Sequence, residues 1–238
     1  MIKAASLILA ATVLAFTAAG VAARPAAKVH GKAHAKVDWA QTFSVTPEGG
    51  FRMGNPKAKF AIVEYGSLTC PHCRHFAESA YKPLVEQYLR TGKASYEFRP
   101  FLLNGLDLAV TLVARCEGPA YFFAIADQLY ATQPEWEGKV LKLPESEQQK
   151  LGAMPQDQML QSYAKISGIF GVAAAHGIAT PRAEACLRDS KAAEALVKIE
   201  KDASDQGVHG TPTIFVNGKQ VPAYDWATLE PFLKDAGG

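Results

Sequence analysis

The sequence predicts an α/β fold that is interrupted by an all-helical block. A short apolar, β-branched run typical of a buried strand lies early in the chain, at residues 60–67, and a second strand pattern follows at residues 94–103. From residue 107 to residue 203 the apolar side chains recur with helical spacing. Strand patterns return only at residues 211–224. Strands on both sides of one helical block indicate a single sheet with a helical insertion.

Length and charge narrow the class of protein. The chain has 238 residues, of which 48% are hydrophobic, so it is long enough to bury a core in one or two domains. Its formal net charge is only +2. Such a small excess of positive charge does not indicate a nucleic-acid partner.

The N-terminus reads as an export signal. Lys3 supplies a positive start, residues 8–16 form an apolar run, and residues 21–23 (Val-Ala-Ala) form a small-residue cleavage site. We therefore expect residues 1–23 to be a cleaved signal peptide. The alternative is an uncleaved membrane anchor; no later apolar run is long enough to span a bilayer.

The next elements follow in order. Residues 24–38 are rich in Ala, Lys, Gly and His without apolar periodicity, which predicts a flexible tail. Turn signals and one early strand are expected between residues 38 and 59. After the buried strand at residues 60–67, a helix begins near Pro71, where the missing N–H costs little. Pro83 should kink this helix, and a glycine ends it before the next strand. The residues on its apolar face are Phe76, Ala80, Leu84, Val85 and Tyr88.

The helical block holds several amphipathic runs. Helices are expected at residues 121–130, 155–170 and 180–207, the last with Thr180 as its N-cap and a proline in its first turn. Residues 144–154 fit a loop or a weak helix. The first run of the block places Ala109, Leu112, Val113 and Cys116 on one face.

The chain closes with a hairpin and a helix. Asn217-Gly218 is a strong two-residue turn between two strand patterns, and Asp225 is a candidate N-cap for the last helix. We therefore assign residues 39–106 and 204–238 to one α/β domain. Residues 107–203 form the inserted helical domain.

The stretch "EYGSLTCPHCRHF" carries the strongest chemical signal. Cys70 and Cys73 follow a buried strand directly and stand at the start of a helix, which is a redox arrangement. The unpaired N–H groups and the dipole of a helix N-terminus stabilise negative charge, so Cys70 is the candidate reactive thiolate. Cys73, one turn into the helix, is the candidate resolving thiol. Pro71 and His72 separate the two.

Two other uses of these cysteines are conceivable. A purely structural disulfide between Cys70 and Cys73 is disfavoured, because closing so small a loop removes little entropy from the unfolded chain. A zinc site would need a second pair of ligands, and Cys116 and Cys186 are not spaced as one. Four cysteines allow three connectivities, and the close spacing of Cys70 and Cys73 favours pairing them, which leaves Cys116 with Cys186.

At these residues the chain resembles the thioredoxin superfamily, and within it the DsbA-type thiol:disulfide oxidoreductases. The matching pieces are "VEYGSLTCPHC", "GVHGTPTIFVNG" and the helical block between them, which together cover most of the chain after residue 60. The resemblance implies a thioredoxin fold with an inserted helical domain. It also implies a cis-proline at Pro212 facing the cysteines, and a Thr211 whose main chain pairs with an extended client.

The same resemblance implies roles for two further residues. His72 would donate to the Cys70 thiolate or stabilise its charge; the alternative is an exposed loop residue without a role. Glu64 would lie beneath the cysteines as a buried acid with a raised pKa and assist proton transfer at Cys73. For Glu64 the alternative is an outward-facing strand residue.

Some DsbA relatives carry a second, structural disulfide in the helical domain, and Cys116 and Cys186 look similar in position. Such a bridge would close about seventy residues and contribute roughly 4 kcal/mol in the chain-entropy model. The alternative is two separate buried thiols. In the oxidising compartment that an export signal implies, the bridge is favoured.

The expected function is that of a monomeric, periplasmic dithiol oxidase that needs no cofactor or metal. It would pass the Cys70–Cys73 disulfide to reduced client proteins, and a membrane partner of the DsbB type would reoxidise it. A disulfide isomerase or reductase is the nearest alternative, kept open by Thr211 before Pro212. A non-enzymatic metal-binding or chaperone module is the alternative from another class.

Overall fold

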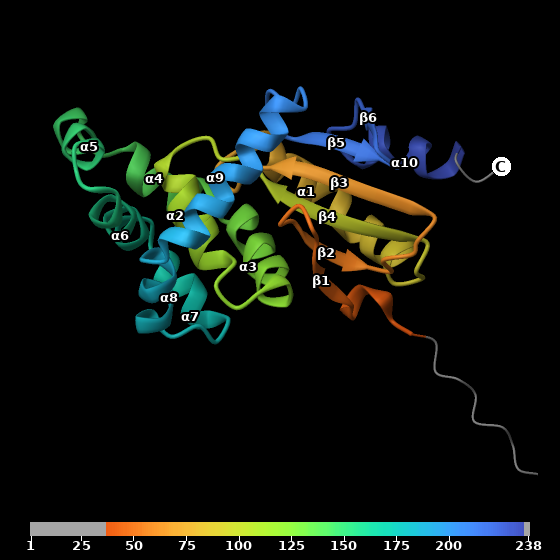
Figure 1. Cartoon of the computed structure of the whole chain (residues 1–238), viewed down its shortest axis with the longest axis horizontal. Helices are drawn as coiled ribbons and strands as arrows, with labels where there is room; N and C mark the ends of the chain where they lie inside the picture. Colours follow the sequence, from red (N-terminus) through yellow and green to blue (C-terminus); the bar gives the residue numbers. More distant parts are fainter. Residues whose placement is uncertain (1–36, 236–238) are drawn as a thin grey trace, which may run out of the picture. The chain divides into compact units, whose positions relative to one another are not determined.

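The computed structural model describes residues 37–235 (Figure 1). The predicted signal peptide at residues 1–23 and nearly all of the predicted tail at residues 24–38 lie outside the described residues. Within the described part, Asp38 caps a short 3₁₀ turn at Trp39–Gln41 by accepting a hydrogen bond from the Ala40 N–H. In this part of the chain, no helix combines the length and apolarity that a bilayer crossing requires.

A mixed sheet forms the centre of the described chain and confirms the predicted α/β class. Its strand order is β1-β2-β4-β3-β5-β6. β3 and β4 are parallel, and the other neighbouring pairs are antiparallel. The strands are β1 Phe43–Val45, β2 Phe51–Gly54, β3 Phe60–Gly66, β4 Ala94–Pro100, β5 Thr213–Val216 and β6 Lys219–Val221.

The expectation of one early strand was wrong, since this region forms two short strands, β1 and β2. They make a hairpin in which the Gly49 N–H donates to the Thr46 carbonyl, and Gly49 has a φ of 80°. The "PEGG" turn is what allows the chain to reverse within so few residues. β2 then pairs with β4 and extends the sheet beyond the β3–β4 unit.

The first helix, α1, covers Pro71–Leu84 and connects the parallel strands β3 and β4. Its buried residues fall on the face predicted for it. Pro83 lies in its last turn, and the chain continues as a π-helical segment, Val85–Leu89. A proline removes one helical N–H, so a change of helix type at this point is expected. Gly92, with a φ of 76°, follows and reverses the chain into β4.

Between β4 and β5 the structure holds helices only, and Figure 1 shows them beyond one end of the sheet. The predicted helix at residues 155–170 is split at Gly168, which has a φ of 82°. The run at residues 180–207 is split where the Asp189 side chain caps a new helix by accepting from the Ala192 N–H. The helices are α2 Gly105–Ala114, α3 Pro119–Ala131, α4 Gln133–Leu141, α5 Glu145–Gly152, α6 Gln156–Ser167, α7 Ile169–Ala175, α8 Thr180–Leu187 and α9 Ser190–Asp205.

The predicted C-terminal hairpin is confirmed. Asn217 and Gly218 have φ values of 51° and 78°, the left-handed pair that a tight turn between β5 and β6 requires. The last helix, α10 (Trp226–Asp235), directly follows Asp225, whose carboxylate accepts from the Thr228 N–H at 2.8 Å. This helix contacts α1 beside the sheet.

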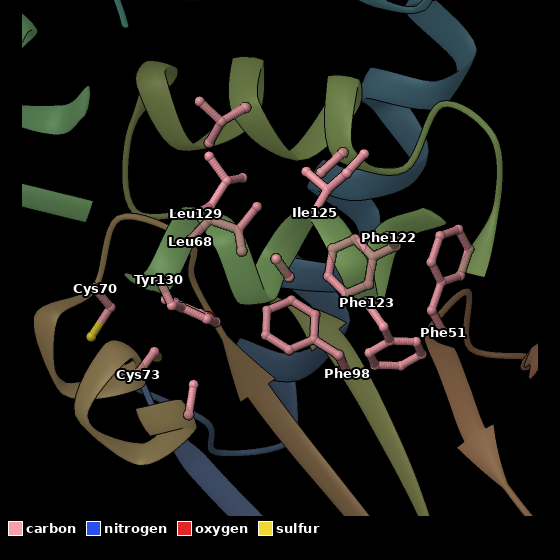
Figure 2. Close-up of a cluster of buried hydrophobic side chains, with 14 of the residues drawn as sticks. Phe51, Leu68, Cys70, Cys73, Phe98, Phe122, Phe123, Ile125, Leu129 and Tyr130 are labelled. Atoms are coloured by element: carbon pink, nitrogen blue, oxygen red, sulfur yellow. The ribbon is translucent and has the colours of Figure 1, made fainter. Parts of the chain in front are cut away.

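One continuous apolar core joins the sheet to the helices. Phe51 and Phe98 from the strands pack against Phe122 of α3, with ring centroids 5.5 and 5.1 Å apart. Figure 2 shows Cys70 and Cys73 beside Tyr130 at one side of this cluster. The core therefore extends to the redox motif, and its apolar side chains pack against the two cysteines.

Candidate active site

The two motif cysteines lie where β3 passes into α1. Cys70 is the N-cap of α1, and Pro71 occupies the first helical position. Both Cys70 and Cys73 are free cysteines, with 4% and 0% of their surfaces exposed. The site therefore presents one sulfur at the helix terminus and a second one beneath it.

The two thiols have opposite acid strengths. The pKa of Cys70 is lowered from an ordinary value of 9.0 to about 5. The largest cause is a hydrogen bond from the Cys73 side chain; burial opposes it, and the Thr211 side chain and main-chain groups of Cys73 and His72 reinforce it. Burial raises the pKa of Cys73 well above its ordinary value. At neutral pH the pair thus holds one thiolate, on Cys70, and one proton, on Cys73.

The helix terminus acts on Cys70 through specific groups. The main chains of His72 and Cys73 belong to the first turn of α1, whose N–H groups have no partner within the helix. The His72 side chain is exposed, as is Pro71, and His72 reaches the Cys70 sulfur through its main chain. A role for the His72 imidazole stays a prediction.

The chain before β5 forms the second wall of the site. The Thr211–Pro212 peptide bond is cis, and the Thr211 carbonyl oxygen lies 3.4 Å from the Cys70 sulfur. Tyr65 pairs with Thr213 in the sheet, and this pairing brings the loop to the end of β3. Thr211 thereby lies beside Cys70, although the two are 141 residues apart in sequence. The sheet register therefore places Thr211 and Pro212 against the redox motif.

Glu64 lies on β3 and is completely buried, with 0% of its surface exposed. The alternative of an outward-facing strand residue is therefore wrong. The Tyr96 hydroxyl donates to Glu64 Oε2 at 2.5 Å. Burial raises the pKa of Glu64 to about 8, while the hydrogen bond from Tyr96 and, to a smaller extent, the neighbouring Cys73 side chain lower it. The carboxyl is mostly protonated near neutral pH and stands next to Cys73.

The helical block supplies residues that the sequence did not single out. Asp107, buried in the first turn of α2, accepts the Leu68 N–H and the Leu103 N–H, both at 3.1 Å. Burial raises the pKa of Asp107 to about 6. Gln133 of α4 donates to the carbonyls of Leu68 and Cys70 at 2.8 and 3.1 Å. These side chains hold the loop that leads into the cysteines.

Part of this support was visible in the sequence. Asn104 precedes Asp107 by three residues, and its side chain accepts the Asp107 N–H at 2.9 Å, which is a helix-start signature. Nothing local to "QPEW" indicates that Gln133 reaches the redox loop. Its role follows from how α4 packs, which the sequence pattern does not give.

The second pair of cysteines is joined by a disulfide. Cys116, just after α2, is bonded to Cys186 of α8, with Cα atoms 5.7 Å apart and a sequence separation of 70. The bridge ties the C-terminal end of α2 to α8, while Asp107 at the start of α2 holds the redox loop. Across residues 37–235, no group of three or more His, Cys, Asp or Glu side chains is placed to hold a metal ion.

A strand, a low-pKa cysteine at a helix N-terminus and a proline loop beside it are the features of a thioredoxin-type redox site. A family model described as "Thioredoxin" matches residues 46–235. The chain belongs to this thioredoxin family. The resemblance inferred from the sequence is therefore confirmed at the level of family and fold.

Solved structures and curated relatives agree with this assignment. A protein-disulfide isomerase from Novosphingobium aromaticivorans is 28% identical, with a TM-score of 0.74 over 79% of this chain and 97% of the other. The alpha-DsbA1 of Wolbachia pipientis, 21% identical, has a TM-score of 0.60 over 81% and 92% of the two chains and shares the fold.

A Rickettsia bellii protein, named provisionally as a protein-disulfide oxidoreductase, is 28% identical over 82% of this chain and 69% of its own length. The chain spans 56% of the length of the similar Rickettsia typhi protein.

Proposed function

We propose that this chain is an exported thiol:disulfide oxidoreductase that introduces disulfides into client proteins. The observation that carries the proposal is the geometry of the pair: Cys70 is the N-cap of α1 and its sulfur lies 3.4 Å from the Thr211 carbonyl oxygen, while Cys73 is fully buried. This arrangement lowers the pKa of Cys70 to about 5 and keeps Cys73 protonated. Stabilising the thiolate stabilises the reduced form of the enzyme, and this makes the Cys70–Cys73 disulfide a strong oxidant. A low-pKa sulfur is also the better leaving group when a mixed disulfide is resolved.

The reaction begins with the oxidised enzyme. A client thiolate attacks the Cys70 sulfur, the Cys70–Cys73 bond breaks, and Cys73 leaves with the electron pair and takes up a proton. The second client thiolate then attacks the client sulfur of the mixed disulfide and releases Cys70 as a thiolate. The client gains one disulfide, and the enzyme leaves with one thiolate and one thiol.

The proline loop is the proposed client platform. Thr211 lies against Cys70, so an extended client segment paired with its main chain would have its sulfur directed to the reactive atom. Pro212 and Pro71 would border that segment. The Thr211 side chain has a second function here, because its hydrogen bond lowers the pKa of Cys70.

The proposed compartment is the periplasm. The predicted signal peptide at residues 1–23 supports export, and a disulfide between Cys116 and Cys186 is in keeping with an oxidising environment. A DsbB-type membrane partner would return the electrons to a terminal acceptor, and a monomer would be the working unit. These partners follow from the family resemblance.

Isomerase activity is the second candidate, favoured by the isomerase name of the similar Novosphingobium structure. Two assays on the same protein separate the candidates. An oxidase should transfer its disulfide to a reduced dithiol peptide within one turnover, and Cys70→Ser should abolish this transfer. Faster recovery of a scrambled disulfide substrate than of a reduced one would instead favour the isomerase. If neither substrate reacts, the proposed function is wrong.

A further inference from the structure

Three oxygen-bearing side chains, two fully buried and one half-buried, form a hydrogen-bonded chain near the cysteines. The hydroxyls of Tyr81 and Tyr96 lie 2.6 Å apart, and the Tyr96 hydroxyl lies 2.5 Å from Glu64 Oε2. Tyr81 comes from α1, Tyr96 from β4 and Glu64 from β3. Tyr96 and Glu64 are both 0% exposed, so their hydrogen bond has no competition from bulk water.

The hydrogen bonds in this chain have one direction. Tyr96 donates its single hydroxyl hydrogen to Glu64 Oε2. The hydrogen between the two tyrosines must therefore come from Tyr81, which fixes the orientation of Tyr96. Because Oε2 already accepts a hydrogen bond, the acidic proton of neutral Glu64 belongs on the other oxygen, Oε1.

Glu64 Oε1 is placed to use that proton. It is buried and has no hydrogen-bond partner among the described residues. It points along β3 toward Gly66, where an added Cβ would stand only 2.7 Å from it. Cys73 lies in α1, which follows β3 in the chain, and its side chain interacts with the same carboxyl. A buried polar atom without a partner is costly, which suggests a functional reason for keeping it open.

We propose that Tyr96, oriented by Tyr81, is a positioning residue that keeps the proton of Glu64 on Oε1, from which it is delivered to Cys73. This inference rests on the proposed function, because it concerns the step in which Cys73 becomes the leaving group. It adds a tyrosine pair to the acid that the sequence had suggested.

The step balances with groups already present. As a client thiolate forms its bond to the Cys70 sulfur, the Cys70–Cys73 bond breaks and its electron pair moves to Cys73. The proton on Glu64 Oε1 passes to the Cys73 sulfur, and Glu64 is left as a carboxylate. The Tyr96 hydroxyl then donates to an ionised oxygen, a stronger hydrogen bond than before. Water restores the proton to Glu64 between turnovers.

Other ionisable groups are coupled to this carboxyl, to its tyrosine partners or to the neighbouring Tyr130, and they also affect the pH profile. They come from α1 and its N-cap, from β4, and from the helices α2 and α3. They are Cys70, Cys73, Tyr81, Tyr96, Asp107, Asp127 and Tyr130.

The first test is a double-mutant cycle on disulfide transfer. Oxidised enzyme is mixed with a dithiol peptide, quenched with acid and scored by alkylation at several pH values. Tyr96→Phe should slow the transfer about tenfold at pH 7, less than the full contribution of a general acid. In a Glu64→Gln background the same change should have no further effect. Equal slowing by Tyr96→Phe in both backgrounds would overturn the proposal.

Two variants serve as comparisons. Tyr65→Phe removes the hydroxyl of a tyrosine on β3, one that accepts a hydrogen bond from Arg99, and should transfer its disulfide as the wild type does. Tyr81→Phe leaves Tyr96 bonded to Glu64 and should give a smaller loss than Tyr96→Phe. A loss from Tyr65→Phe equal to that from Tyr96→Phe would mean that any buried hydroxyl matters, which contradicts the positioning role.

The second test needs no activity. The infrared band of the protonated Glu64 carboxyl, identified by its absence in Glu64→Gln, is followed against pH in the reduced protein. In the wild type it should disappear around pH 8. Tyr96→Phe should move this midpoint upward by about one pH unit or more, because the carboxylate loses a hydrogen bond. An unchanged midpoint overturns the proposal, even if peptide oxidation has failed and the proposed function with it.

Discussion

The hydrogen bond from Cys73 to Cys70 gives the sharpest prediction for the redox site. It is the largest cause of the lowered Cys70 pKa, ahead of the Thr211 side chain and the main chains of Cys73 and His72. Cys73→Ala removes this donor and leaves the α1 terminus intact. Cys73→Ser is the matched control, because its hydroxyl can still donate.

The size of the change follows from the loss of one hydrogen bond to a charged group. Such a bond contributes about 1.5–3 kcal/mol, which corresponds to roughly one to two pKa units. In Cys73→Ala the pKa of Cys70 should therefore rise from about 5 into the range of about 6–7. In Cys73→Ser it should stay near 5.

The assay is a titration of thiolate absorbance. Each single-thiol variant contains Cys70 as its only free thiol, so the ultraviolet signal reports this group alone. A Cys70 pKa that stays near 5 in Cys73→Ala would refute the reasoning. The N–H groups at the helix terminus would then be sufficient to hold the thiolate.

Three further predictions concern stability. The pKa of Cys70 is about 5 in the folded protein and 9.0 ordinarily, so the unfolded chain binds more protons between these two pH values. The stability that the Cys70 thiolate contributes is therefore complete above about pH 9 and is lost as the pH falls to about 5. From pH 7 to pH 5 the reduced protein should lose about 1–2 kcal/mol relative to the oxidised protein, after allowance for solvent screening; equal losses in denaturant unfolding would contradict this. Asp107→Ala strands the Leu68 N–H and should cost about 2–4 kcal/mol in urea unfolding, so an unchanged midpoint would refute its role. The double variant Cys116→Ala, Cys186→Ala should lose up to about 4 kcal/mol but still oxidise peptides; loss of oxidation would tie the bridge to the chemistry.

The sequence predicted the fold class and the place of the redox motif because both rest on local patterns. A buried strand, a proline at a helix start and an Asn-Gly turn each have their own chemical signature, and the structure has them at Phe60–Gly66, Pro71 and Asn217-Gly218. The two short strands at the beginning were harder to separate. Their pairing depends on the turn at Gly49 as much as on their side chains.

The parts of the site that were missed depend on contacts between distant segments. Tyr96 reaches Glu64 because β3 and β4 are paired in parallel with Ile62 opposite Tyr96. Glu64 follows Ile62 by two residues, so the side chains of Glu64 and Tyr96 lie on the same face of the sheet. Gln133 and Asp107 reach the redox loop because α2 and α4 lie against the segment between β3 and α1. Sequence periodicity identifies a buried face but does not identify the partner that the face meets.

The central claim, that the Cys70–Cys73 disulfide is a strong oxidant, is tested most directly by its equilibrium with glutathione. The purified protein is incubated in buffers of known ratio of reduced to oxidised glutathione, quenched with acid, and scored for free thiols. A lowered Cys70 pKa and a stabilised reduced form predict a reduction potential less negative than about −180 mV. A potential near about −270 mV, the range of a reductant, would contradict the account.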